Sequence, residues 1–261
     1  MNRMRALGNY LNYYFRASTR YDIHSPFVFE LLTRVIENKV KSPVFEPIET
    51  LRKQLKQSQD EIEVIDLGAG SVHLKGSRRK IRDVVNYSAK SPKYAQLLYR
   101  LCNHFLPGEI LELGTSLGIS TLYLHAGNPQ ANLHTLEGGP EIADRARQHF
   151  FLLHAPEIQI SVGPFEETLK ACLQKGKKAD FVFFDGNHRK APTLEYFQMC
   201  LGNSHAQSVF VFDDIHWTTE MEEAWEEIKK HPSVTLTIDL HFLGLVFFMG
   251  GLEKQHFTVR F

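Results

Sequence analysis

Short apolar runs alternate with amphipathic stretches from residue 109 onward, and this alternation constrains the fold more than any other feature of the sequence. Helical patterns occupy 117–127, 140–152, 164–175 and 190–201. The runs that they separate have the length and apolar content of buried strands, and they are Glu109–Leu113, Asn132–Leu136, Gln159–Val162, Phe181–Phe184 and Ser208–Phe212. Strands that alternate with helices predict a doubly wound α/β fold, in which helices cover both faces of a mostly parallel sheet.

The remaining segments extend this sheet at one end and precede it at the other. A helix at Glu220–Lys230 leads to Val234–Asp239 and Leu245–Met249, which are close enough to form an antiparallel hairpin at the sheet edge. The expected sheet therefore has seven strands. Residues 1–90 differ: short amphipathic helices are expected at 3–16 and 26–38, and a polar helix followed by the short strand Glu63–Ile65 is expected within 50–65. We expect a helical, lid-like extension over 1–90 and the sheet domain over 91–261.

Composition excludes several classes of protein. A chain of 261 residues with a formal net charge of zero lacks the basic excess of a non-specific nucleic-acid binder. Cys102, Cys172 and Cys200 show no C-x-x-C spacing, so we expect buried thiols in a reducing cytoplasm rather than a zinc site or disulfides. Neither a secretory signal nor an apolar span is evident, so we expect a cytoplasmic protein without a membrane partner.

The segment after the first expected strand carries the clearest ligand-binding signal. An apolar strand containing Glu112 leads into a turn with Gly114 and Gly118, and a helix follows. Glycines let a backbone approach a ligand closely, and the exposed N–H groups at the start of a helix suit an anionic group. We expect Thr115 and Ser116 to line the same turn. The alternative is a tight structural turn with no ligand.

Two further strand ends support a nucleoside ligand. Glu137 ends the next strand, where an acid can accept hydrogen bonds from ribose hydroxyls. Dinucleotide-binding folds use the same device, but their G-x-G-x-x-G pattern is incomplete here, which leaves a nicotinamide-dependent oxidoreductase as an alternative. After the third strand, Gly163 leaves room for an adenine ring, and Phe165 can pack on that ring or in the core.

Taken together, these segments resemble the catechol O-methyltransferase-like branch of the class I, Rossmann-like, S-adenosylmethionine-dependent methyltransferases. The resemblance covers roughly Ser91 to Phe248, and the expected edge hairpin fits it. It rests on Glu112–Ser120, Glu137, Phe181–His188 and Phe210–Asp214. It implies that S-adenosylmethionine is the cofactor, with its carboxylate at the helix start and its ammonium balanced by Glu112. A homodimer is also implied.

Acidic residues follow the fourth and fifth strands, at the edge where open α/β sheets bind ligands. Asp185, Asp213 and Asp214 would repel one another there unless a cation intervened, and a hard divalent ion such as Mg²⁺ suits oxygen ligands. The resemblance implies that these three aspartates hold the metal, with Asp214 in place of a more usual asparagine, and that Asp185 also contacts the cofactor. His188 is the candidate general base; the alternative is a loop histidine that only forms hydrogen bonds.

These residues favour methyl transfer to a hydroxyl oxygen of a small molecule. The segment Asp185–His188 is not the Asn/Asp-Pro-Pro-Tyr/Phe motif of enzymes that methylate base amines, so a nucleic-acid acceptor is not expected. Two alternatives stay open. One is a metal-independent methyltransferase whose acids only orient the acceptor. In either case, His216 and Trp217 follow the aspartate pair and line the substrate pocket or pack beneath the loop. The other is a non-catalytic scaffold whose aromatic N-terminal region binds a partner; that region contains Tyr10, Tyr13, Tyr14 and Phe15.

A second glycine loop, Val64–Ser71, also has the appearance of a cofactor loop. Its context argues against that role, because the following Val72–Lys80 is a poor helix and no strand ending in an acid lies at the expected distance. We expect a glycine turn at this point. Arg78, Arg79 and Lys80 would then lie in a solvated loop, or would meet an anionic group if the loop closed over the ligand.

Overall fold

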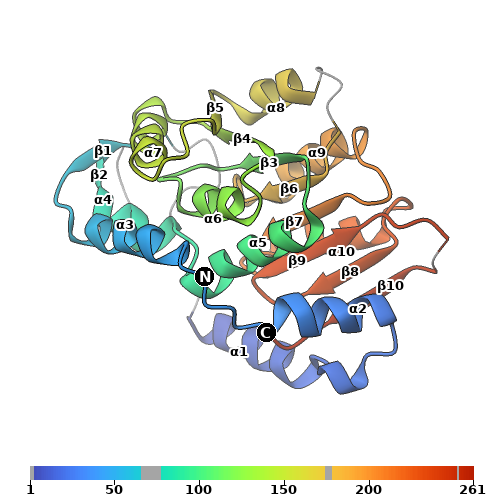
Figure 1. The fold of residues 1–261 in the computed structure, drawn as a ribbon. Helices are drawn as coiled ribbons and strands as arrows, with labels where there is room; N and C mark the ends of the chain where they lie inside the picture. The colour runs from blue at the N-terminus through green and yellow to red at the C-terminus, as the bar shows by residue number, and fades with distance from the viewer. Residues whose placement is uncertain (1–2, 66–77, 174–177, 252) are drawn as a thin grey trace. The chain divides into compact units, whose positions relative to one another are not determined.

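The computed structural model describes residues 3–65, 78–173, 178–251 and 253–261 (Figure 1). The chain forms two compact units. The terminal unit comprises Met1–Asn38 and Lys178–Phe261, and the central unit comprises Lys39–Lys177. These divisions lie elsewhere than the boundary expected after residue 90, which stays a prediction.

The central unit contains the first three strands of the expected series. The strands β3 (Glu109–Leu113), β4 (Asn132–Glu137) and β5 (Gln159–Val162) pair in parallel in the order β3-β4-β5. The helices that separate or follow them are α6 (Ile119–Gly127), α7 (Pro140–Leu152) and α8 (Phe165–Leu173). Parallel strands require such crossover helices, so the predicted alternation is confirmed in this unit.

A further helix, α5 (Pro92–Phe105), precedes β3 and begins with the proline expected at a helix start. It approaches α6 very closely. A Cβ atom added to Gly127 of α6 would lie 2.6 Å from the carbonyl oxygen of Tyr99 and 2.7 Å from Cβ of Cys102. Only glycine permits this spacing at residue 127. Cys102 is fully buried there, as predicted, and Cys172 and Cys200 are also buried and form no disulfide.

The first part of the central unit differs from expectation. The helix α3 (Phe45–Gln57) begins before residue 50, and the strand β1 is Glu61–Glu63 rather than Glu63–Ile65. Arg78–Lys80 form a second strand, β2, antiparallel to β1, and the helix α4 (Ile81–Ser88) follows. Each glutamate of β1 faces a basic residue of β2, and such cross-strand pairs stabilise a ribbon that sequence periodicity does not reveal. Most of the second glycine loop, Asp66–Ser71, lies outside the described residues.

The terminal unit carries the remaining expected strands and one more. β6 (Phe181–Phe184) and β7 (Val209–Asp213) are parallel, and β8 (Leu236–Asp239) and β9 (Leu243–Phe247) form the predicted antiparallel hairpin. The additional strand β10 (Gln255–Thr258) lies parallel to β8, giving the order β10-β8-β9-β7-β6. The helices α9 (Lys190–Leu201) and α10 (Thr219–Lys230) complete the series. The α/β class with mostly parallel pairing is therefore confirmed.

The N-terminal helices belong to this terminal unit. They are α1 (Arg3–Arg16), the short η1 (Arg20–Asp22), α2 (Pro26–Leu31) and the π-helical η2 (Leu32–Ile36). The helix expected over 26–38 therefore changes its hydrogen-bonding pattern after Leu31. The Tyr13 hydroxyl donates to the carbonyl oxygen of Val259, and Ser18 N–H donates to that of Thr258 over 2.9 Å. The end of α1 and the residues that follow it are thus joined to the C-terminal segment (Figure 1). Among the described residues, no helix has the length and apolar character needed to cross a membrane.

Candidate functional site

The turn after β3 takes backbone conformations that its glycines allow. Gly114 and Gly118 have φ angles of 106° and 79°, and Ser116 between them has φ 48°. A Cβ atom on Gly118 would also lie 2.5 Å from the ring of Phe150. The N–H groups of Gly114 and Thr115 both donate to the carbonyl oxygen of Leu136 at the end of β4. These bonds hold the turn against the neighbouring strand, so the start of α6 has a defined place.

Glu112 lies beneath this turn and is completely buried. One of its oxygens, Oε2, accepts hydrogen bonds from the hydroxyls of Thr121 and Thr135. The other, Oε1, has no hydrogen-bond partner among the described residues. Burial disfavours the charged form and raises the pKa of Glu112 to about 7, although the hydroxyl hydrogen bonds act against this shift. A buried carboxylate oxygen without a donor fits a cationic group that a ligand would supply.

Glu137 ends β4, as predicted, and its carboxylate joins two loops. Oε2 accepts a hydrogen bond from Ser116 N–H at 2.8 Å, and Oε1 accepts one from Gly139 N–H at 3.0 Å. An ionised carboxylate is an acceptor only, which is the type of group that ligand hydroxyls donate to. The side chain therefore fixes the turn after β3 and lies beside it.

The loop after β5 meets the same group of strand ends. Gly163 has φ 142°, and its N–H donates to the carbonyl oxygen of Glu137 over 2.9 Å. Phe165 begins α8 and is half-buried. The structure thus brings most of the expected cofactor residues of the central unit together through the ends of three neighbouring strands. They are Glu112, Gly114, Thr115, Ser116, Gly118, Glu137 and Gly163.

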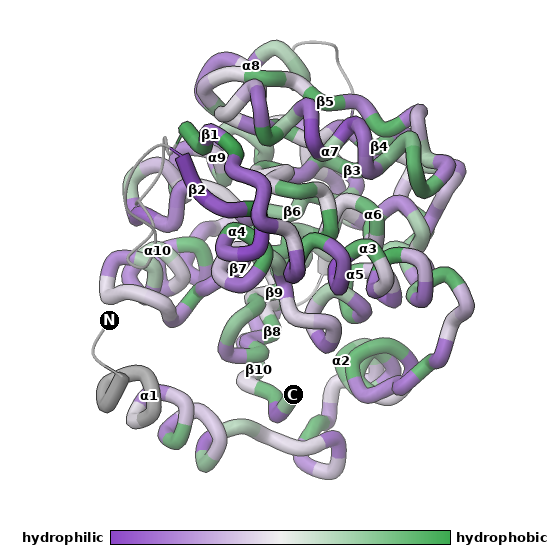
Figure 2. The backbone as a smooth tube through the Cα atoms, turned by 90° about the vertical axis from the view of Figure 1, so that its left-hand side faces the viewer, coloured by the Kyte–Doolittle hydropathy of each residue, from purple (hydrophilic) through white to green (hydrophobic). Residues whose placement is uncertain are grey.

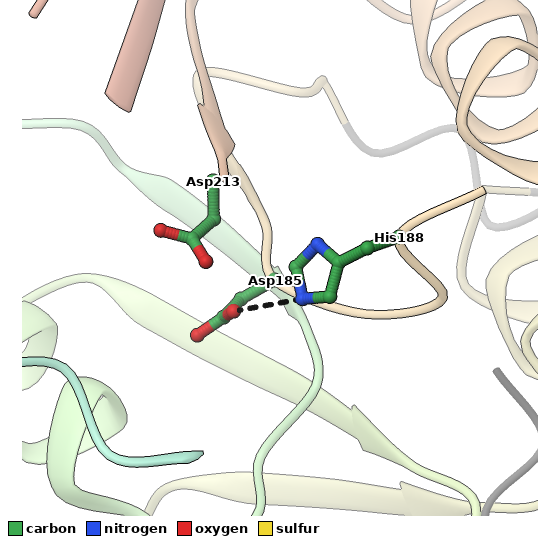
Figure 3. A group of neighbouring side chains, drawn as sticks. All are labelled: Asp185, His188 and Asp213. Carbon is green, nitrogen blue, oxygen red and sulfur yellow. Dashed lines mark ion pairs between the residues drawn. The ribbon is translucent and has the colours of Figure 1, made fainter. Parts of the chain in front are cut away.

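In the terminal unit, a second group lies where β6 and β7 end. Asp185 follows β6, Asp213 ends β7, and His188 lies in the loop after Asp185 (Figure 3). One potential ligand atom from each residue lies within 4.8 Å of the others. His188 Nε2 is 3.7 Å from Asp185 Oδ1, and Asp213 is only 1% exposed. Two carboxylates and an imidazole therefore face one another, as they would around a divalent cation.

Asp214 is not one of these three residues. Its backbone is left-handed, with φ 53°, and its N–H donates to the carbonyl oxygen of Phe242 over 2.7 Å. The chain therefore turns away from the direction of β7 at residue 214, whereas Asp213 is still part of that strand. The group with ligand spacing consists of two aspartates and His188. The assignment of Asp214 as a ligand stays a prediction.

Sequence reasoning missed two residues close to His216. His216 Nε2 and Asp239 Oδ2 are 2.7 Å apart, and the rings of His216 and His241 stack at 5.5 Å. Burial lowers the pKa of His216, but the hydrogen bond and charge of Asp239 outweigh it and leave that pKa above its usual value. Burial, with the neighbouring His216, lowers the pKa of His241 to about 4. Asp239 and His241 lie in the β8–β9 hairpin, where the sequence shows no motif that marks them.

The sequence around these strand ends is similar to that of known proteins. Residues 111–215 match a family described as a methyltransferase domain. This part of the chain is therefore similar to a methyltransferase domain. A catechol O-methyltransferase of Niastella koreensis is 31% identical over 134 residues, which are 50% of this chain and 58% of that relative. The match therefore spans a little over half the length of that relative.

Solved methyltransferase structures share the fold. An O-methyltransferase from Bacillus cereus in complex with SAH has a TM-score of 0.56 and 20% identity, over 85% of this chain and 97% of that one. The O-methyltransferase TomG from Streptomyces achromogenes, in complex with SAM, has a TM-score of 0.55 and 24% identity, over 63% and 83%. The Rossmann-like fold of class I methyltransferases is therefore confirmed for this domain, as the resemblance in the sequence predicts.

Proposed function

We propose that this methyltransferase domain transfers a methyl group from S-adenosylmethionine to a hydroxyl oxygen of a small molecule, with assistance from a divalent cation. The observation that carries the choice of a hydroxyl acceptor is the group formed by Asp185, His188 and Asp213. A neutral hydroxyl is a weak nucleophile, and these residues are the types that hold a cation or accept its proton. The relatives named above are O-methyltransferases, which supports the same choice.

The central unit would bind the cofactor. The ammonium group would occupy the place of the missing donor at Glu112 Oε1, and the ribose hydroxyls would donate to Glu137. The N–H groups at the start of α6 would face the carboxylate. Gly163 and Phe165 would border the adenine ring. The additional cofactor contact expected from Asp185 stays part of this proposal.

The donor set of the terminal unit fits a divalent cation. Two carboxylates suit Mg²⁺, whereas an imidazole nitrogen favours a first-row transition ion such as Mn²⁺. Asp185 and Asp213 would hold the ion in either case, and His188 would join them only with the nitrogen-binding metal. When bound, the cation lowers the pKa of a hydroxyl that it contacts. Because a ligated nitrogen cannot accept a proton, His188 is either a ligand or a base in a given turnover.

The described residues include an acceptor for the proton that the hydroxyl group would lose. Bound S-adenosylmethionine would supply the methyl group: the hydroxyl oxygen would form the new O–C bond as the C–S bond breaks, and the electron pair would stay on sulfur to give S-adenosylhomocysteine. The hydroxyl proton passes to His188, and the carboxylate of Asp185, 3.7 Å away, stabilises the resulting imidazolium. Alignment of oxygen, methyl carbon and sulfur supplies much of the remaining acceleration.

The test is methyl transfer from labelled S-adenosylmethionine to a panel of phenols, catechols and sugars, with Mg²⁺, Mn²⁺ or a chelator. We expect turnover of at least one hydroxyl acceptor, loss of activity with chelator, and loss in Asp213→Asn. His188→Gln distinguishes the two roles of that residue: a base changes the pH profile, whereas a ligand changes the concentration of metal needed. Full activity in chelator would refute the metal. Cofactor binding without turnover would favour the scaffold alternative.

The homodimer and the cytoplasmic location stay predictions.

A further inference from the structure

The helix α1 presents apolar side chains to solvent as well as to the protein. Leu11, Tyr14 and Phe15 are 44%, 39% and 79% exposed, and their spacing of three and four residues places them on one side of the helix. Tyr13, on the opposite side, is 7% exposed. The helix therefore has a second apolar stripe, formed by Leu11, Tyr14 and Phe15, that does not face the protein.

The inward face of α1 is fixed, so this stripe cannot turn inward without breaking specific contacts. Tyr13 donates its hydroxyl proton to Val259, and Asn9 Nδ2 donates to Glu222 Oε1 of α10 over 2.9 Å. Tyr13 also packs on the ring of His241, with 4.9 Å between the ring centroids. Exposure of Phe15 is thus a consequence of how α1 is attached.

Positive charge accompanies the stripe. The first 21 residues contain Arg3, Arg5, Arg16 and Arg20 and no aspartate or glutamate, although the whole chain has a net charge of zero. Arg20 is paired with Glu37 at 3.4 Å. Arg16 is exposed in the last turn of α1. Figure 2 shows hydrophilic and hydrophobic residues alternating along this helix.

Another basic group comes from the far end of the chain. The guanidinium of Arg260 lies over the ring of Tyr14, 4.1 Å from its centroid, and donates to the carbonyl oxygen of Tyr14 over 3.0 Å. The aromatic part of the stripe is therefore bordered by a cation that the C-terminal segment supplies.

We propose that α1 binds the surface of an anionic phospholipid bilayer, with Leu11, Tyr14 and Phe15 at the boundary between headgroups and acyl chains. A helix with an apolar stripe, aromatic residues and basic flanks is the type that lies in this boundary. Arginines near an anionic surface are attracted to lipid phosphates, and tyrosine favours the headgroup level. The expectation of no membrane partner rested on the absence of an apolar span, which a helix lying on the surface does not need.

A second copy of the chain fits the stripe less well. A two-fold contact through α1 would bring the same arginines of both copies together, and like charges at close range oppose association. A stable dimer also buries about 800 Å² on each partner, more than three side chains on one helix provide. A bilayer supplies the opposite charge and accepts a narrow stripe.

The test is co-sedimentation of the full chain with vesicles of phosphatidylcholine alone and of phosphatidylcholine with phosphatidylglycerol. We expect binding to the anionic vesicles, little binding to the neutral ones, and weaker binding as salt is added. Phe15→Ser should lower the partition constant about tenfold, because it removes a large apolar side chain from the boundary. Arg16→Glu should lower it about thirtyfold, because it changes the charge by two.

The control variant is Phe151→Ser. Phe151 is 76% exposed, close to the value for Phe15, but lies on α7 of the central unit, so this change should leave vesicle binding unaltered. Retained S-adenosylhomocysteine affinity would show that each variant is folded. The proposal is overturned if the chain stays in the supernatant, if Phe15→Ser binds like the wild type, or if neutral vesicles bind it equally. It is also overturned if, without lipid, the chain is a dimer that Phe15→Ser dissociates.

Discussion

The raised pKa of Glu112 predicts that cofactor affinity depends on pH. Burial raises the pKa of this carboxyl to about 7, so a large fraction of the free protein carries it protonated near neutrality. The ammonium group of S-adenosylhomocysteine would pair only with the ionised form. Binding must then release a proton, and affinity must rise as pH rises through 7.

The magnitude follows from the fraction of ionised Glu112. With a pKa of about 7, the ionised fraction is about 9% at pH 6 and about 76% at pH 7.5. If only the ionised form binds, the dissociation constant should fall about eightfold over this interval, which is about 1.2 kcal/mol. The upper end of this interval lies just below the usual α-amino pKa of about 7.7–8.0, so the ammonium group of the ligand stays mostly protonated throughout.

Isothermal calorimetry with S-adenosylhomocysteine measures both consequences. Titrations in two buffers of different ionisation enthalpy give the number of protons released, which we expect to approach one at pH 6. Glu112→Gln keeps the shape of the side chain but cannot ionise, so it should bind more weakly and lose the pH dependence. An unchanged dissociation constant between pH 6 and 7.5 in the wild type, or the same slope in Glu112→Gln, would refute the pairing of Glu112 with the ammonium group.

Three further predictions concern stability, each measured by urea unfolding. Because the folded pKa of Glu112 is raised from 4.5 to about 7, the free energy of unfolding of the unliganded protein should fall by up to about 3 kcal/mol as pH rises between these two values. Glu112→Gln should not show this part of the fall. Gly244→Ala should destabilise by about 1–3 kcal/mol, because the new Cβ would lie 2.7 Å from the Trp225 ring; an unchanged midpoint would contradict this packing. Tyr13→Phe should lower the free energy of unfolding by about 1–2 kcal/mol, because the Val259 carbonyl loses its donor. An unchanged free energy of unfolding would mean that water replaces the hydroxyl.

Elements with strong local signals were predicted closely. The expected helices 140–152 and 190–201 coincide with α7 and α9, and the expected strand 109–113 coincides with β3. Pro140 pre-sets the backbone at the first position of α7, and continuous apolar runs define the buried strands. The glycine turn was found for a related reason, since the positive φ angles of residues 114 and 118 favour glycine.

Elements that depend on distant partners were not predicted. β10 contains Gln255 and His256, has half-exposed or exposed residues, and is formed by pairing with β8. β1 and β2 depend on facing charges from segments about 17 residues apart. No strand was expected over residues 255–258, although Phe257, Val259 and Phe261 alternate with polar residues over a short stretch. Long-range backbone pairing decides the structure of these segments, and single-sequence periodicity does not record it.

The candidate site likewise has one part that the sequence predicts and another part that only the structure shows. Parallel strands end at one edge, so the sequence places Asp185 and Asp213 near each other. It cannot show that residue 214 turns into a left-handed conformation while His188 comes within ligand distance of both aspartates, because loop geometry determines these details. The sequence therefore predicts the class of chemistry at this edge more securely than the identity of the third ligand.

The distribution of these residues between the two units makes the proposed roles separable. Every residue expected to bind the cofactor, other than Asp185, belongs to the central unit, whereas the group of two aspartates and His188 belongs to the terminal unit. A substitution at Glu112 should therefore change cofactor affinity before it changes the requirement for metal, and a substitution at Asp213 should do the reverse. Since α1 belongs to the terminal unit, the helix proposed to bind lipid is held by the same compact body that carries the acidic group. Calorimetry with the cofactor and with the metal alone can thus assign a loss of activity to one half of the chemistry.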